Sequence, residues 1–183
     1  MLFRSVKVAD AWNPDVDTAA GNQCKSYGAP AIMRVPGRVH ITWDDDRTIK
    51  LEADAGTQTR MLRFVKPAQK GDASWQGDSS AEWDVQNAGR GAAPNTPRRG
   101  SLKVVTTNLK SGYLRKNGIP YSEDAKLTEY FDIVRGRNGD VLLMVTSIVD
   151  DARYLRQPFI VSTQFKKQAD AGGWEPTPCS STW

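Results

Sequence analysis

The stretch Gly112-Tyr-Leu-Arg-Lys-Asn-Gly-Ile-Pro-Tyr121, which runs on towards Thr128-Glu-Tyr-Phe-Asp132, says most about the fold of this 183-residue chain. Asn117-Gly118 favours a tight turn with both central residues at positive φ, so the flanking residues are expected to fold back as a hairpin. Pro120 has no backbone N–H to donate, which favours an edge position. Residues 112–122 are therefore predicted to form a hairpin that acts as a lid.

The strand predicted over 126–134 places one acid among apolar residues. Side chains alternate between the two faces of a strand, so Glu129 shares a face with Leu127 and Phe131 and should point into an apolar interior. A carboxylate in such a place must pair, accept hydrogen bonds or remain protonated. Arg60 lies on the apolar face of another predicted strand and is the candidate partner.

The same alternation recurs along the chain. Seven more strands are predicted, over 39–43, 48–53, 57–64, 80–85, 101–109, 141–149 and 159–165. Eight strands joined mostly in sequence predict an all-β fold, an antiparallel eight-stranded up-and-down barrel of the lipocalin-like kind. Its interior would be filled by side chains or hold one small ligand. A two-sheet sandwich is the alternative, because the long loops at 65–79 and 87–100 leave room for a change of sheet.

We expect one domain over residues 1–183. Residues 1–38 contain too many Gly, Pro and Asn turn signals for a long element, so they should wrap the domain or plug one end of it. The barrel would span 39–168. The tail, 169–183, would be tied back if a disulfide forms.

Charge and hydropathy exclude several classes of protein. The chain has 25 basic and 21 acidic residues, and the two signs are interspersed. The clustered basic surface typical of nucleic-acid binding is missing, so no nucleic-acid partner is predicted. Mean hydropathy is −0.55 and no run approaches the ~20 apolar residues of a transmembrane segment. The oligomeric state is left open.

The two cysteines, Cys24 and Cys179, lie near opposite ends of the sequence. With one histidine and no closely spaced cysteines, no metal site is predicted. A disulfide and two separate thiols are both compatible with the spacing, and a disulfide would indicate an oxidising compartment. Residues 1–8 lack the apolar run of a signal peptide, which predicts either a cytoplasmic protein or a leader already removed.

Aromatic residues and the histidine supply candidate ligand-binding positions. Tyr113 and Tyr121 flank the hairpin turn, where they could contact a ligand, act as acid and base, or pack the hairpin onto the barrel rim. Further candidates are Trp43 and Phe131 on predicted inner faces, His40 if polar residues line the cavity, and the loop residues Trp75 and Trp174. The nucleophile-elbow, P-loop and dinucleotide patterns are absent, so no cofactor is predicted.

Several motifs resemble a group of uncharacterised bacterial proteins that are mostly predicted to be exported. These motifs, within residues 20–179, are 54–60, 112–122, 128–132, 157–160 and Pro176-Thr-Pro-Cys179. The group has no established activity. The resemblance implies an exported, lipocalin-like barrel in the periplasm or outside the cell, and it favours the disulfide.

Two main hypotheses follow. In the first, the barrel binds a small apolar or aromatic molecule in its interior under the 112–122 lid. In the second, the protein is a cofactor-independent lyase or isomerase, in which Glu129 or a tyrosine moves a proton and Arg60 stabilises the developing anion. A third possibility is an interaction protein with a filled barrel and an exposed tryptophan patch.

Overall fold

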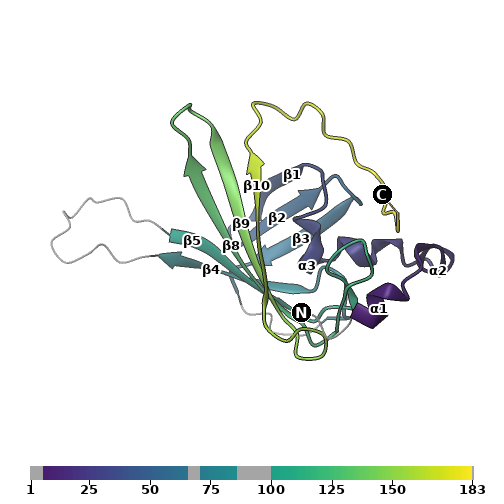
Figure 1. The fold of residues 1–183 in the computed structure, drawn as a ribbon. Coiled ribbons are helices and arrows are strands. Elements are labelled where there is room, and N and C mark those ends of the chain that lie inside the picture. Colours follow the sequence, from purple (N-terminus) through teal and green to yellow (C-terminus); the bar gives the residue numbers. More distant parts are fainter. Residues whose placement is uncertain (1–5, 66–70, 86–99, 183) are drawn as a thin grey trace.

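The computed structural model describes residues 6–65, 71–85 and 100–182 (Figure 1). Short helices come first: α1 Val6–Asp10, α2 Pro14–Ala19, the 3₁₀ helix η1 Gln23–Tyr27 and α3 Ala29–Ile32. Ten strands follow: β1 Val39–Asp45, β2 Thr48–Ala53, β3 Gln58–Arg63, β4 Asp78–Val85, β5 Gly100–Thr107, β6 Gly112–Tyr113, β7 Pro120–Tyr121, β8 Lys126–Arg135, β9 Val141–Asp150 and β10 Phe159–Lys166.

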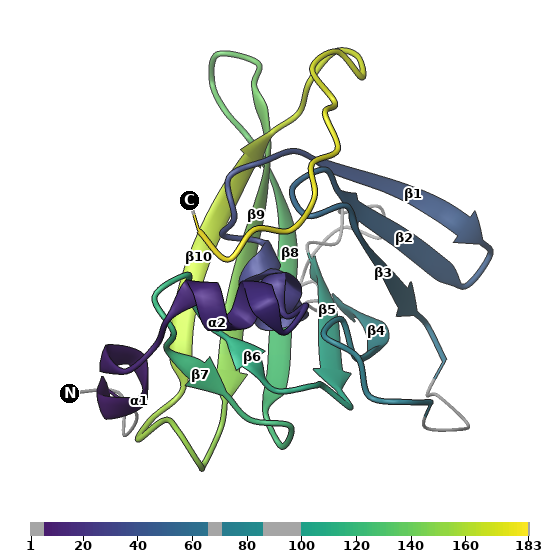
Figure 2. The ribbon, with the colours of Figure 1, turned by 90° about the vertical axis from the view of Figure 1, so that its right-hand side faces the viewer.

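Eight strands form one strongly curled sheet in the order β1-β2-β3-β4-β5-β8-β9-β10 (Figure 2). Each of the eight predicted ranges overlaps one of these strands, so the all-β class is confirmed. The single main sheet also excludes the two-sheet sandwich among the described residues. The predicted loop at 87–100 and part of that at 65–79 lie outside the described residues.

The prediction of a closed antiparallel barrel was wrong in two respects. β4 runs parallel to β3 and pairs with it through two positions, Leu62 with Ser79 and Arg63 with Ser80, so the sheet is mixed. The connection of residues 64–77 is long enough to return the chain to the same end of the sheet, which a short hairpin cannot do. The edge strands β1 and β10 are not paired with each other, so the sheet stays open.

The inner face of the curl is apolar and is partly filled by the N-terminal segment. Side chains from adjacent strands line up in rows across this face; one row is Trp83, Leu102, Phe131 and Val145. Tyr27, Ile32 and Met33 pack into the deep half of the face against residues from β2, β3, β5 and β9. Burying this apolar surface is what fixes the short helix α3, which has too few residues to be stable alone.

The 112–122 segment forms the predicted hairpin, with β6 paired to β7 and Gly118 at φ 74°. It does not cover the mouth of the curl as a lid. A side chain at Gly118 would collide with Trp12, and Gly112 lies against the carbonyl of Lys25. The hairpin therefore packs onto the N-terminal helices, because its aromatic and apolar residues are buried there together with Phe159 and Leu127.

A disulfide joins Cys24 in η1 to Cys179 in the tail. The predicted bond is thus confirmed. The tail also bonds to the turn between β2 and β3: Thr177 N donates to Asp54 O at 3.0 Å, and Thr57 Oγ1 donates to Thr177 O at 3.0 Å. The tail is therefore fastened both to η1 and to the β2–β3 turn.

Removing the disulfide should destabilise the fold. A cross-link that closes a loop of 155 residues restricts the unfolded chain, and losing a native disulfide typically costs about 2–5 kcal/mol. We expect Cys24→Ala, Cys179→Ala and the double variant to show the same loss in denaturant unfolding. Losses that add in the double variant would show that the two sulfurs act separately.

Candidate functional site

A deep apolar cleft occupies the half of the concave face that α3 leaves unfilled. Its volume is about 1280 Å³, and all eight strands of the main sheet contribute to its walls together with residues 167–174 of the tail. Leu51, Leu62, Leu102, Phe131 and Leu143 line it as members of consecutive inner-face rows. It is the natural place for a ligand, since binding sites in curved sheets are concave and mostly apolar.

Several large apolar side chains of this inner face remain exposed. Trp83 is 57% exposed and Ile133 63%, although strand alternation places both on the same side as the buried Leu102 and Phe131. Ile41 on β1 is 40% exposed. Singly exposed apolar residues are ordinary, but a contiguous concave group of them is a candidate binding surface.

Three aromatic rings form a row at the open end of the curl. Trp43 stacks on Phe64 at 5.6 Å between ring centres, and Phe64 meets Trp83 at 5.5 Å. Trp43 was predicted to face the core, but 57% of it is exposed, and Trp83 is the member of the row that lines the cleft. The row extends the apolar wall towards solvent and presents flat surfaces to a ligand.

The rim of the cleft is polar and is partly built by the tail. His40 lies at this rim, with Nδ1 3.4 Å from Glu52 Oε2 and its ring 6.1 Å from that of Trp174. Gly173 packs against the guanidinium of Arg38. The tail therefore crosses the gap between β10 and β1 and places Trp174 over the cleft, where this loop residue was predicted to line an opening.

Glu129 and Arg60 pair as predicted, but deep inside the sheet. The guanidinium of Arg60 donates to both carboxylate oxygens of Glu129, at 3.1 Å from Nη1 and 2.5 Å from Nη2. Nη2 also lies 3.3 Å from the hydroxyl of Thr106, which is 2.8 Å from that of Ser79. Glu129 is 0% exposed and Arg60 2%, and neither lines the cleft. A substrate in the cleft does not touch the pair, so its geometry favours a structural role.

The two candidate tyrosines belong to the hairpin and lie among the N-terminal helices. Tyr113 donates to Asp17 Oδ2 at 2.8 Å, and Trp12 Nε1 donates to the same oxygen at 2.8 Å. Burial, followed by the hydrogen bond to Asp17, raises the pKa of Tyr113. Burial also raises the pKa of Tyr121, which is 0% exposed and lies against Gly28 and Gly112. Of the roles left open for these tyrosines, their contacts are those of packing, with the hairpin held against the N-terminal helices.

Asp17 is the electrostatic centre of this N-terminal region. Lys25 Nζ lies 3.0 Å from Asp17 Oδ1 and completes a set of three donors with Trp12 and Tyr113. Burial acts to raise the pKa of Asp17, but the three hydrogen bonds and the charge of Lys25 outweigh it and lower the pKa. The ionised carboxylate thus ties α2 to η1 and to the hairpin.

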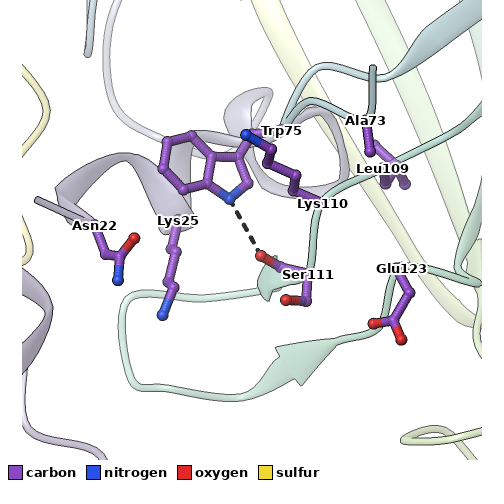
Figure 3. Close-up of a pocket in the computed structure, with 8 residues that line it drawn as sticks. All are labelled: Asn22, Lys25, Ala73, Trp75, Leu109, Lys110, Ser111 and Glu123. Atoms are coloured by element: carbon purple, nitrogen blue, oxygen red, sulfur yellow. Dashed lines mark hydrogen bonds between the residues drawn. The ribbon is translucent and has the colours of Figure 1, made fainter. Parts of the chain in front are cut away.

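Trp75 lies outside the cleft, in a second and smaller pocket (Figure 3). Of the predicted ligand-binding residues, His40 and Phe131 line the cleft and Trp43 lies at its open end. The sequence interpretation missed Trp83, Ile133, Leu143 and Phe165. All four continue the inner-face alternation of predicted strands, and that alternation could have identified them.

Other kinds of site have no counterpart in the described ranges. Among residues 6–65, 71–85 and 100–182, no three His, Cys, Asp or Glu side chains are placed to hold a metal ion. Within the same ranges, no helix combines the length and apolar character needed to cross a bilayer. In comparisons with family models, curated proteins and solved structures, none matched the chain. The cleft is therefore interpreted from its own geometry.

Breaking the buried pair should be costly. Glu129→Gln keeps the shape of the side chain but leaves the Arg60 charge buried without its anion, a change that typically costs about 3–5 kcal/mol. In urea unfolding we expect a loss of this size. The double variant Arg60→Met/Glu129→Leu, which removes both charges, should recover most of it. A stable Glu129→Gln variant would contradict a structural role for the pair.

The Asp17 carboxylate predicts a pH dependence of stability. Because its folded-state pKa lies below the ordinary 3.8, the ionised group contributes stability that is present above that value and is lost as pH falls through the folded pKa. The difference in unfolding free energy between wild type and Asp17→Asn should be constant near neutral pH. It should shrink below about pH 4. A difference that does not change down to pH 2 would argue against an ionic role.

Proposed function

We propose that the protein binds a small, mostly apolar or aromatic molecule in the cleft inside its curled sheet. The observation that carries the proposal is the apolar wall that continues beyond the N-terminal plug formed by Tyr27, Ile32 and Met33. Trp83 and Ile133 are more than half exposed on this wall. Inner-face residues of one sheet are normally buried. A ligand in the cleft would bury the part of the apolar inner face that α3 leaves exposed.

The chemistry of the cleft favours an elongated apolar ligand with one polar end. Its volume of about 1280 Å³ exceeds the range of about 300–1,000 Å³ usual for small-molecule pockets. Covering roughly 200 Å² of apolar surface would contribute about 5 kcal/mol before the cost of association. The polar groups, among them Arg38, His40 and Lys167, lie at the rim, where they would meet the polar end.

No specific observation favours a lyase or isomerase reaction. An acid or base must reach the reacting group directly or through one water. Glu129 and Arg60 are sealed within the sheet, and both tyrosines lie with the N-terminal helices. His40 lies at the rim, where its Nδ1 is 3.4 Å from Glu52 Oε2. We therefore propose a binding protein rather than an enzyme.

We also propose that the protein works in the periplasm or outside the cell. Its support is the disulfide between Cys24 and Cys179, since structural disulfides persist in oxidising compartments. An apolar ligand carried through an aqueous compartment needs a protein that shields it from water. The cleft offers such shielding.

Two isoleucines of similar exposure on opposite faces of the main sheet allow a matched test. Ile133, 63% exposed, lines the cleft, whereas Ile160, 60% exposed, is on the outer face of β10. We expect Ile133→Arg to weaken binding of the apolar dye Nile red at least tenfold, because it places a charge on the apolar wall. Ile160→Arg should bind as wild type does. Equal affinities for all three proteins would refute the proposal.

A further inference from the structure

The pocket around Trp75 is separate from the cleft and different in chemistry. It has a volume of about 340 Å³ and is built by four segments: the start of η1, the residues before β4, the β5–β6 connection and the β7–β8 connection. Figure 3 shows the indole of Trp75 above a hollow bordered by Lys25, Ser111 and Glu123. Five of its eight lining residues are polar or charged, although most of its lining surface is apolar, as it is in the cleft.

The indole of Trp75 is held rigidly before any ligand arrives. Its Nε1 donates to the carbonyl of Ser111 at 3.1 Å, and its backbone carbonyl accepts from Ala29 N at 2.8 Å. The preceding residue, Ser74, forms a bridge with Leu109 and accepts from Lys110 N at 2.8 Å. The indole N–H thus already has its hydrogen-bond acceptor, while the flat face of the ring borders the pocket. A fixed aromatic surface binds a flat ring with little loss of conformational entropy.

The charges around the pocket leave one cation available. Lys25 is paired with Asp17 at 3.0 Å, and Glu123 is paired with Arg153 at 2.9 Å. Lys110 Nζ lies over the Trp75 ring, 5.9 Å from its centre, in a cation–π contact, and has no carboxylate partner among the described residues. Its ammonium can therefore accept an anion without breaking an ion pair.

Two neutral polar groups complete the lining. The Asn22 amide and the Ser111 hydroxyl border the pocket, and neither side-chain group has a hydrogen-bond partner in the part of the chain that is described. The Asn22 amide and the Ser111 hydroxyl can each donate a hydrogen bond to the oxygens of a carboxylate. An aromatic surface, an available cation and two free polar groups therefore face one small hollow.

We propose that this pocket binds a small aromatic carboxylate, with its ring on the indole of Trp75 and its carboxylate on the ammonium of Lys110. Stacking and ion pairing each give a modest gain in water, and together they select a ligand that carries both groups. A volume of about 340 Å³ suits a single ring with its acid group. The site is independent of the cleft and of the function proposed for it.

The test follows the indole N–H resonances by NMR while benzoate is added to the full chain. We expect the Trp75 resonance, identified by its loss in Trp75→Leu, to shift and to saturate. Acetate, which has the charge without the ring, and benzyl alcohol, which has the ring without the charge, should bind at least tenfold more weakly. Equal shifts with either compound would overturn the proposal, as would a benzoate shift that never saturates.

Lys110→Met provides a variant that keeps Trp75 in place. It should weaken benzoate binding at least tenfold, while Lys126→Met, at an exposed lysine on β8 outside the pocket, should not. Ile133→Arg in the cleft should also leave benzoate binding unchanged, which separates the two sites. Unaltered binding by Lys110→Met would refute the assigned role of Lys110.

Discussion

The shape of this protein depends on an ion pair that spans the inside of its sheet. Arg60 is on β3 and Glu129 on β8, and two strands, β4 and β5, lie between them in the sheet. A flat sheet would separate these strands by about 14 Å, given a strand spacing of about 4.8 Å. The curl brings the two strands closer across the concave face, which fits the bidentate contact, and Ser79 and Thr106 on the intervening strands extend the same polar network. The pair also reinforces the weak parallel junction of β3 with β4, where two residue pairs meet. A buried ion pair contributes little net stability but can specify one arrangement over others.

The cleft is a consequence of where this curl is filled and where it is not. Tyr27, Ile32 and Met33 pack into the deep half of the concave face. The inner-face rows continue beyond them along the long strands β8 and β9, to Ile133 and Leu143, and nothing in the described chain covers Ile133. Because side-chain alternation cannot change face within a regular strand, the apolar pattern that builds the core also builds the exposed wall.

The limits of sequence interpretation follow from the same geometry. The alternation of apolar and polar residues predicted the strands and placed Glu129 and Arg60 on inner faces. It could do so because the face on which a side chain lies depends only on its position along its own strand. Which strands pair is not local, so the parallel β3–β4 contact and the open edges were missed. Trp43 has the correct face but was predicted to be buried, since alternation does not say how far the filling extends. The surroundings of Tyr113 could not be predicted from a local pattern, because its hydroxyl bonds to Asp17, a residue 96 positions away.

The tail, which builds part of the cleft rim, is joined to the N-terminal segment by a single covalent bond. Cys24 precedes the plug formed by Tyr27, Ile32 and Met33, and Cys179 follows the tail that places Trp174 at the rim. Their disulfide fixes the plug and the tail to each other and, through the bonds of Thr177 to the β2–β3 turn, to the sheet. The tail that builds part of the rim is therefore held to η1 and to the sheet, so the proposed ligand would meet a rim that is partly fixed before binding. Such preorganisation lowers the entropic cost of association, which matters most for a ligand held mainly by non-directional apolar contact.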